Sequence, residues 1–350
     1  MKSNYKKLAP YIRLVDIRNT SDERYDLLGV SVDKHFIKSI ANTIGTDWRT
    51  YKVIQKGQFC YIPDTSRRGD KMGIALLTDY DIALVSQAYT IFEIINQEQL
   101  LPEYLNLWFK RPEFDRYARF HSHGSVREIF DWEEMCNVEL PIPEIEEQRK
   151  IVEAYNTIEK RIALKRKIND NLEAVLAASH SKMFFSKDTS EHSKLGELMT
   201  FGNGKSRPKT DGPIPVYGGN GVLSYTDHHN IENAVLIGRV GAYCGSVYLE
   251  QGICWVSDNA IFAKSKITKD EFFDYFLLKR LNLFNHHVGT GQQLLTQEIL
   301  NNIEVPKPVT EQIELFNRKA ASVFETIFTN SREIIWLQEL SDLLLSRLAG

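Results

Sequence analysis

Several short segments carry the residue types that enzymes use to bind phosphates. The triplet Gly204-Lys205-Ser206 matches the last three letters of a P-loop, in which backbone amides and a lysine hold the phosphates of a nucleotide. The glycine that must open such a loop would fall at position 199, which is Met199. Without that glycine the phosphate cradle lacks its turn, so we exclude a P-loop.

Two other enzyme signatures are incomplete. The run 201–204, Phe-Gly-Asn-Gly, imitates the glycine-rich loop of a methyltransferase, but the chain has no Asn/Asp-Pro-Pro-aromatic motif to hold a flipped amino base. Asp64 and Asp70, with Lys71, hint at a metal-dependent nuclease, which needs carboxylates around a divalent ion beside a lysine. Their spacing does not fit, and the second half of the chain has no counterpart. The sequence therefore shows no catalytic centre.

Histidines and cysteines do not form metal-ligand patterns. The adjacent histidines at 228–229 and 286–287 would point in different directions on a strand, so neither pair is placed to bind one ion. The cysteines show no C-x-x-C spacing, which is typical of buried or half-buried thiols in a reducing compartment. Because no run of 18 apolar residues and no signal-peptide core occurs, we expect a cytoplasmic protein. The cysteines are Cys60, Cys136, Cys244 and Cys254.

Basic residues gather in local clusters, and such clusters can bind nucleic-acid phosphates. The net charge is −3 and no segment of the chain forms a basic arm, but phosphate binding needs local Lys and Arg rather than a basic total. Each cluster is also compatible with a solvated surface. The clusters are Arg67, Arg68 and Lys71; Lys205, Arg207 and Lys209; and the basic residues of 160–167.

Long helices are the elements that must position these clusters. Pro141 and Pro143 hold the backbone extended ahead of the segment 144–185, which contains no glycine or proline. Apolar positions in this segment are spaced alternately four and three apart, which predicts a coiled-coil seam. One helix of this length would be about 60 Å long. The seam is Ile151, Tyr155, Ile158, Ile162, Lys165, Asn169, Leu172, Leu176, Ser179 and Met183.

The same pattern occurs a second time. The segment 303–308 repeats 138–143 at an offset of 165, and 286–295 matches 121–130 at the same offset. Glu311-Gln312 answers Glu147-Gln148 one residue out of step. The chain is therefore a tandem duplication. The second seam is Phe316, Ala320, Val323, Ile327, Asn330, Ile334, Leu337, Ser341, Leu344 and Leu348.

The duplication predicts an α+β fold of two mixed α/β domains, each followed by a long helix. With 350 residues, 43% of them hydrophobic, the chain can build two cores. Helical spacing predicts core helices over 101–118 in the first domain and 272–281 in the second. The expected boundaries are 1–143 for the first domain, 144–187 for the first helix, 188–308 for the second domain and 309–350 for the second helix.

The repeated arrangement resembles the specificity subunit of type I restriction-modification systems. In each half a G-[ST]-x-[RQ] segment precedes an [LV]-P-x-P break, and a Glu-Gln pair then opens a long helix. The resemblance covers essentially the whole chain. It implies two target recognition domains, each reading one half of a bipartite, asymmetric double-stranded DNA site. It also implies that the helices pack as an antiparallel coiled coil that sets the spacer and docks the methyltransferase subunits.

The resemblance places catalysis on other subunits. Two modification subunits would bind S-adenosylmethionine and methylate adenine, and restriction subunits would use ATP and Mg²⁺ to translocate and cleave DNA. This chain would hold no cofactor and no metal. The candidate DNA contacts are Arg67, Arg68, Lys71 and Arg127 in the first domain, and Lys205, Arg207, Lys209, Asn220, Arg239 and Gln292 in the second. The residues expected to pack the spacer helices are Ile151, Tyr155, Ile158, Ile162, Leu172, Leu176, Phe316, Val323, Ile327, Ile334, Leu337 and Leu344.

Three other functions remain alternatives. A catalytic modification protein, or one fused to a nuclease, would need the donor and catalytic motifs that the sequence lacks. A coiled-coil scaffold with modules that do not bind DNA would show no salt-dependent DNA affinity. Within the same class, the chain could serve a related system that cuts on both sides of its site, or act as an orphan specificity subunit.

Overall fold

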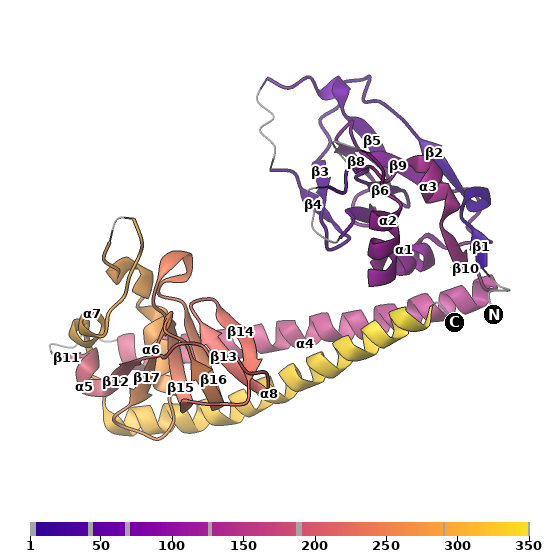
Figure 1. Ribbon diagram of the computed structural model, residues 1–350. Coiled ribbons are helices and arrows are strands. Elements are labelled where there is room, and N and C mark those ends of the chain that lie inside the picture. Colours follow the sequence, from indigo (N-terminus) through magenta and orange to yellow (C-terminus); the bar gives the residue numbers. More distant parts are fainter. Residues whose placement is uncertain are drawn as a thin grey trace. The chain divides into compact units, whose positions relative to one another are not determined.

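The chain divides into two compact units. Unit 1 comprises residues 1–164 and 334–350, and unit 2 comprises residues 165–333. The computed structural model describes residues 5–40, 45–66, 71–124, 128–186, 191–289 and 291–348. Two long helices, α4 (Ile145–Phe185) and α8 (Thr310–Arg347), each contribute a segment to both units (Figure 1).

Unit 1 contains two four-stranded sheets. One has the order β2-β9-β6-β7 and is antiparallel throughout. The other has the order β4-β3-β8-β5 and contains one parallel pair, β3 with β8. The strands are β2 (Ile12–Val15), β3 (Leu27–Val30), β4 (Phe36–Lys38), β5 (Lys52–Gln55), β6 (Phe59–Tyr61), β7 (Ile74–Leu76), β8 (Ile82–Val85) and β9 (Thr90–Ile94).

The β2-β9-β6-β7 sheet packs against other elements on both faces. Successive side chains of a strand point to opposite sides, so neighbouring residues of β6 enter different cores. Phe59 and Tyr61 of β6 pack into an apolar cluster with the helices, whereas Cys60 between them packs into a second cluster with the other sheet. In the first cluster, Phe59 stacks on Phe92 with ring centroids 4.9 Å apart. Unit 1 therefore has one core between its sheets and another beneath its helices.

Two helices, rather than one, cover the first sheet of unit 1. The expectation of a single helix over 101–118 is wrong, because the chain forms α1 (Pro102–Lys110) and α2 (Pro112–Phe120). Arg111 between them is extended, with φ −71° and ψ 138°. Proline disfavours the helical conformation in the residue before it, so Pro112 ends one helix and begins the next.

Unit 2 is built on one six-stranded sheet of order β12-β17-β15-β16-β13-β14. Its pairs are antiparallel except β13 with β16. Helix α6 (Phe272–Arg280) and the neighbouring parts of α4 and α8 cover one face, where Val235, Ile237 and Ile261 are buried. The strands are β12 (Met199–Asn203), β13 (Ile214–Gly218), β14 (Gly221–Thr226), β15 (Ile231–Gly238), β16 (Val247–Val256) and β17 (Ala260–Ser265), and the short helix α5 spans Leu195–Leu198.

The duplication is visible in matching elements. Strand β1 (Tyr5–Lys7) pairs with β10 (Glu139–Pro141), and β11 (His192–Lys194) pairs in the same antiparallel way with β18 (Glu304–Pro306). Helix α3 (Trp132–Asn137) and α7 (Gln297–Asn302) occupy equivalent positions at the offset of 165. The predicted architecture, two α/β domains each followed by a long helix, is confirmed.

The long helices pair antiparallel in each unit. In unit 1 the Ser341 hydroxyl donates a hydrogen bond to Glu159 Oε1 at 2.9 Å. In unit 2 the ring of His180 lies 5.3 Å from that of Phe316. Later residues of α4 therefore meet earlier residues of α8. Every one of the predicted seam positions is buried or half-buried. Among the described residues, no helix is both long and apolar enough to span a lipid bilayer.

A polar layer interrupts the seam in unit 2. Lys165 Nζ lies 2.7 Å from Glu333 Oε2 and donates a hydrogen bond to Asn330 Oδ1 at 2.9 Å. Asn330 Nδ2 in turn donates to Asn169 Oδ1 at 2.9 Å. Polar groups at a seam favour the register that satisfies them all.

Each long helix also holds the start of a core helix through an amide side chain. In unit 1 Gln148 Oε1 accepts a hydrogen bond from the Leu101 amide at 2.9 Å, next to the start of α1. In unit 2 Asn317 Oδ1 accepts one from the Phe273 amide at 2.8 Å, in the first turn of α6. Gln312, the counterpart suggested by the sequence, is exposed. In unit 2 the equivalent hydrogen bond is made by Asn317, about one helical turn further along α8.

Candidate DNA-binding surfaces

Three glycine-containing loops of unit 2 converge where β13 and β15 end. The Ser246 hydroxyl donates to the Gly219 carbonyl, which joins the turn after β13 to the loop after β15. The Gly241 amide donates to the Gln293 carbonyl at 3.1 Å, which joins that loop to residues 291–295. These hydrogen bonds fix the loops to one another.

Glycine is required where these loops pass closest. A Cβ on Gly238 would lie 2.2 Å from the Tyr243 carbonyl oxygen. Gly245 has a φ of +85°, which L side chains rarely adopt, and a Cβ there would lie 2.4 Å from the Phe284 amide nitrogen. The glycine pattern seen in the sequence therefore serves tight packing of loops.

Three of the sequence-predicted residues lie on these joined loops. Asn220 and Gln292 are exposed, and Arg239 is half-buried. The Arg239 backbone is held on both sides, because its amide donates to the Asn259 carbonyl at 3.0 Å and its carbonyl accepts from the Leu295 amide at 2.9 Å. Its Nε is buried without a hydrogen-bond partner among the described residues. A rigid backbone and a guanidinium whose Nε has no partner suit ligand binding.

The basic cluster of unit 2 lies on the neighbouring loop after β12. The Lys205 amide donates to the Val256 carbonyl at 2.9 Å, and its carbonyl accepts from Trp255 Nε1 at 3.4 Å. Lys205, Arg207 and Lys209 are exposed. No helix opens after this segment, which agrees with the exclusion of a P-loop.

In unit 1 one of the four predicted residues can be placed. Lys71 is exposed and pairs with Asp33, with Nζ 3.2 Å from Oδ1. It lines a cavity of about 790 Å³ formed by the loop at 32–34, the end of α1, α2 and the long helices. Arg67, Arg68 and Arg127 lie outside the described residues.

The cavity beside Lys71 contains further cations that the sequence did not single out. Lys34, which has a positive φ of 63°, is buried and forms an ion pair with Asp115 of α2. The Asp115 carboxylate also accepts a hydrogen bond from the Met72 amide at 2.9 Å. Burial lowers the pKa of Lys34, against the opposing effect of Asp115. The buried pair fixes the loop that carries Lys34 to α2.

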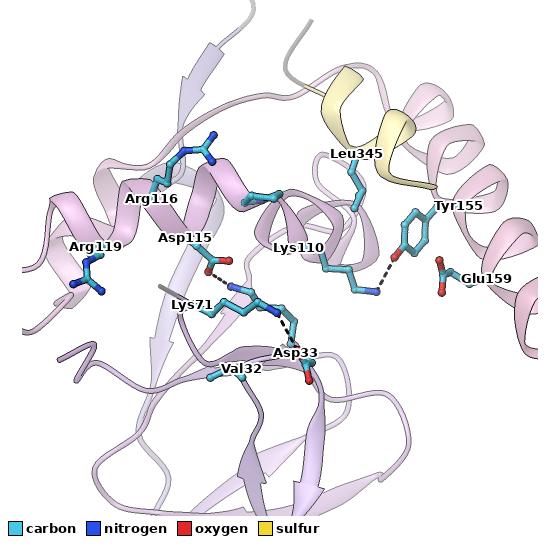
Figure 2. A pocket seen from close by; sticks show the side chains of 12 residues that line it. Val32, Asp33, Lys71, Lys110, Asp115, Arg116, Arg119, Tyr155, Glu159 and Leu345 are labelled. Atoms are coloured by element: carbon cyan, nitrogen blue, oxygen red, sulfur yellow. Dashed lines mark hydrogen bonds and ion pairs between the residues drawn. The ribbon is translucent and has the colours of Figure 1, made fainter. Parts of the chain in front are cut away.

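Lys110, Arg116 and Arg119 complete the cationic lining. Figure 2 shows Lys110 reaching from the end of α1 toward Tyr155 of α4, with Lys71 and Asp33 across the cavity. Lys110 Nζ lies 3.4 Å from the Tyr155 hydroxyl and 4.8 Å from the centroid of its ring. Burial lowers the pKa of Lys110, which Glu159 opposes. The available sequence signal was the set of basic residues along 110–119, which are Lys110, Arg111, Arg116 and Arg119.

The described part of the chain presents no group of three or more His, Cys, Asp or Glu side chains that could hold a metal ion. All four cysteines are free, and Cys60, Cys244 and Cys254 are buried. The features that remain are basic loops, a cationic cavity and paired helices.

A duplicated α/β domain, with a long paired helix after each copy and with basic residues on the loops of unit 2 and in the cavity of unit 1, fits a DNA-recognition protein. The sequence matches the family described as type I restriction modification DNA specificity domain twice, over residues 6–174 and 187–336. The chain belongs to this family, as the repeated motifs indicated. It is thus a DNA-specificity subunit of the type I restriction-modification class and not a catalytic one.

Two relatives agree with this assignment. The type I restriction enzyme MjaIX specificity subunit of Methanocaldococcus jannaschii is 21% identical over 305 residues, which cover 73% of this chain and 70% of that protein. The crystal structure of the type I restriction-modification S subunit from M. genitalium has a TM-score of 0.63 at 15% identity. That match covers 99% of this chain and 96% of the other. The latter similarity shows a shared fold.

Proposed function

We propose that each domain of this chain reads one half of a bipartite, asymmetric DNA site and thereby directs adenine methylation. Residues 1–143 would read one half-site and residues 188–308 the other. The helices at 144–187 and 309–350 would set the number of unread base pairs, because half-site spacing follows protein geometry. With restriction subunits, the same site would direct ATP-dependent cleavage.

The observation that carries this proposal is the duplication. Equivalent strand pairs, β1 with β10 and β11 with β18, precede equivalent long helices. The loops differ between the units, since the joined glycine loops occur in unit 2 and the Lys110 cavity in unit 1. Two domains that share a framework but differ in their loops suit a DNA site whose two halves differ in sequence.

The long helices also present apolar surface that supports docking of two methyltransferase subunits. Trp336 is 65% exposed, and Leu340 and Leu343 follow it on the same face of α8. Large exposed apolar groups at this spacing commonly mark a protein interface. S-adenosylmethionine, ATP and Mg²⁺ would then be bound by the partner subunits, and this chain would supply only recognition.

Mapping methylated adenines tests the proposal directly. The chain is co-expressed with the methyltransferase encoded beside it, and the host DNA is sequenced for modified bases. We expect a split, asymmetric motif with a constant gap. Exchanging 188–308 for the equivalent domain of a related chain should change one half of the motif and leave the other half and the gap unchanged. If no motif appears and no complex forms, the scaffold function gains support.

Replacing Arg239 should weaken recognition of one half-site. The Arg239→Met change removes a guanidinium that has no carboxylate partner within ion-pair distance among the described residues. A lost arginine contact to a base edge costs about 1–3 kcal/mol, or about 5-fold to 150-fold in affinity. Quantitative binding of duplexes altered in either half, in complex with the methyltransferase, measures the loss and its location.

The matched control is Lys269→Met, which removes one exposed positive charge of unit 2 away from the joined loops. It should leave both half-sites intact. Equal losses in the two variants would show that only the net charge matters at Arg239.

A further inference from the structure

Lys110 is a cation of the unit 1 cavity that forms no ion pair within the described part of the chain. Asp115 pairs with Lys34, and Asp33 pairs with Lys71. Lys110 forms no ion pair with any described residue, and its ammonium meets only the Tyr155 hydroxyl and ring. The Glu159 carboxylate also lines the cavity and opposes the lowering of the Lys110 pKa, but it forms no ion pair with Lys110 and accepts a hydrogen bond from Ser341.

The walls of this cavity suit a ligand with an anionic group and an apolar part. Tyr155, Pro112 and Leu345 supply apolar surface beside Lys110. A half-buried ammonium without an ion-pair partner is costly, and a bound anion would recover that cost. A lysine ammonium with donors in several directions binds phosphate oxygens well.

We propose that this cavity binds a phosphate group, with Lys110 as the direct contact and Lys71 as the second cation. The favoured source is the DNA backbone beside the first half-site, so this inference rests on the proposed function. Arg116 and Arg119 are exposed on α2 at one edge of the same cavity, which extends the row of cations in the way a phosphate polymer requires. A free nucleotide or inorganic phosphate offers the same group.

The salt dependence of DNA binding tests the polymer source. The full chain and its Lys110→Met variant are titrated with a labelled duplex at several salt concentrations. Each neutralised phosphate contributes about 0.9 to the slope of log affinity against log salt, so the variant should lose about that amount and bind more weakly. Lys56→Met is the control, because Lys56 is an exposed lysine of unit 1 that lies 3.8 Å from Asp81. It should keep the slope of the unaltered chain.

Thermal unfolding with inorganic phosphate or ATP tests the free source. A ligand that binds the folded state raises the unfolding midpoint. The midpoints of the unaltered chain and of Lys56→Met should rise, whereas that of Lys110→Met should rise less. Without ligand, Lys110→Met should unfold near the temperature of the unaltered chain, because the ammonium forms no ion pair that the change would break.

The two experiments separate this inference from the proposed function. If the unaltered chain binds no DNA but loses its phosphate-induced stabilisation on Lys110→Met, the site stands and the proposed function fails. If the chain binds DNA while Lys110→Met matches Lys56→Met in slope and in both midpoint shifts, the phosphate site is refuted. A changed slope, or a phosphate shift that depends on Lys110, supports it and identifies the source.

Discussion

Phe316→Ala should lower the free energy of unfolding of unit 2 by about 3–5 kcal/mol, because a fully buried phenylalanine leaves both lost contacts and a cavity. Phe316 is 1% exposed, on the first half of α8. Its ring lies 5.7 Å from that of Phe276 on α6 and 6.0 Å from that of Phe184 on α4. One side chain therefore joins the domain helix to both long helices within unit 2.

Chemical denaturation measures the loss, and hydrogen–deuterium exchange should place the weakened amides in residues 165–333. The control is Phe120→Ala, since Phe120 is 81% exposed and its removal should change stability by less than about 0.5 kcal/mol. Similar losses in both variants would contradict the packing of α8 against α6.

Asp274→Asn should make the stability of unit 2 much less dependent on pH. Asp274 is 1% exposed in the first turn of α6. Burial, with a smaller contribution from Glu271, raises its pKa to about 7 against the opposing effect of the Ser265 hydroxyl. The unfolded chain releases the same proton near pH 3.8, so between about pH 4 and pH 7 only the folded state retains it.

The sign of this linkage is a loss of stability as the pH rises. Stability from the retained proton is fully present below about pH 4 and disappears as the pH passes through about 7. The difference between the two pKa values corresponds to about 4 kcal/mol at most. The asparagine variant carries no such proton, so its advantage over the unaltered chain should be larger at pH 8 than at pH 5.

Denaturation at both pH values measures the difference. Burying an amide has its own cost, but that cost is the same at each pH and cancels in the comparison. Asp211→Asn is the control, because Asp211 is an exposed aspartate of unit 2. A constant gap between Asp274→Asn and the unaltered chain would show that Asp274 is ionised in the folded state.

The architecture was predictable because it depends on the spacing of the seam residues and on a sequence repeat. Both patterns, the seam spacing of alternately four and three residues and the repeat offset of 165, can be recognised without knowledge of tertiary contacts. The error over 101–118 arose because apolar spacing continues through Pro112, although the helix does not. The role of Asn317 was likewise hidden, since the start of α6 selects whichever amide side chain reaches it.

The candidate sites were only partly predictable. Arg239 and Gln292 could be selected as polar residues beside glycines, but the backbone bonds that join their loops connect residues far apart in the chain. Lys110 gave less signal in the sequence, because Tyr155, the residue that its ammonium contacts, follows it by 45 residues. Sequence patterns thus indicate which residues can bind, while the fold determines which of them lack a partner.

The polar layer of the long helices also bears on which helices can associate. At the offset of 165, the position equivalent to Glu333 in α4 is Ile168, and the position equivalent to Lys165 in α8 is Asn330. Two copies of α4 paired with each other would therefore leave each Lys165 without a carboxylate, and two copies of α8 would leave each Glu333 without a lysine. Only unlike helices join the two charges, at 2.7 Å in this structure. Because matched charges at a seam select the partner, mixtures of copies should favour α4 with α8 over like pairs.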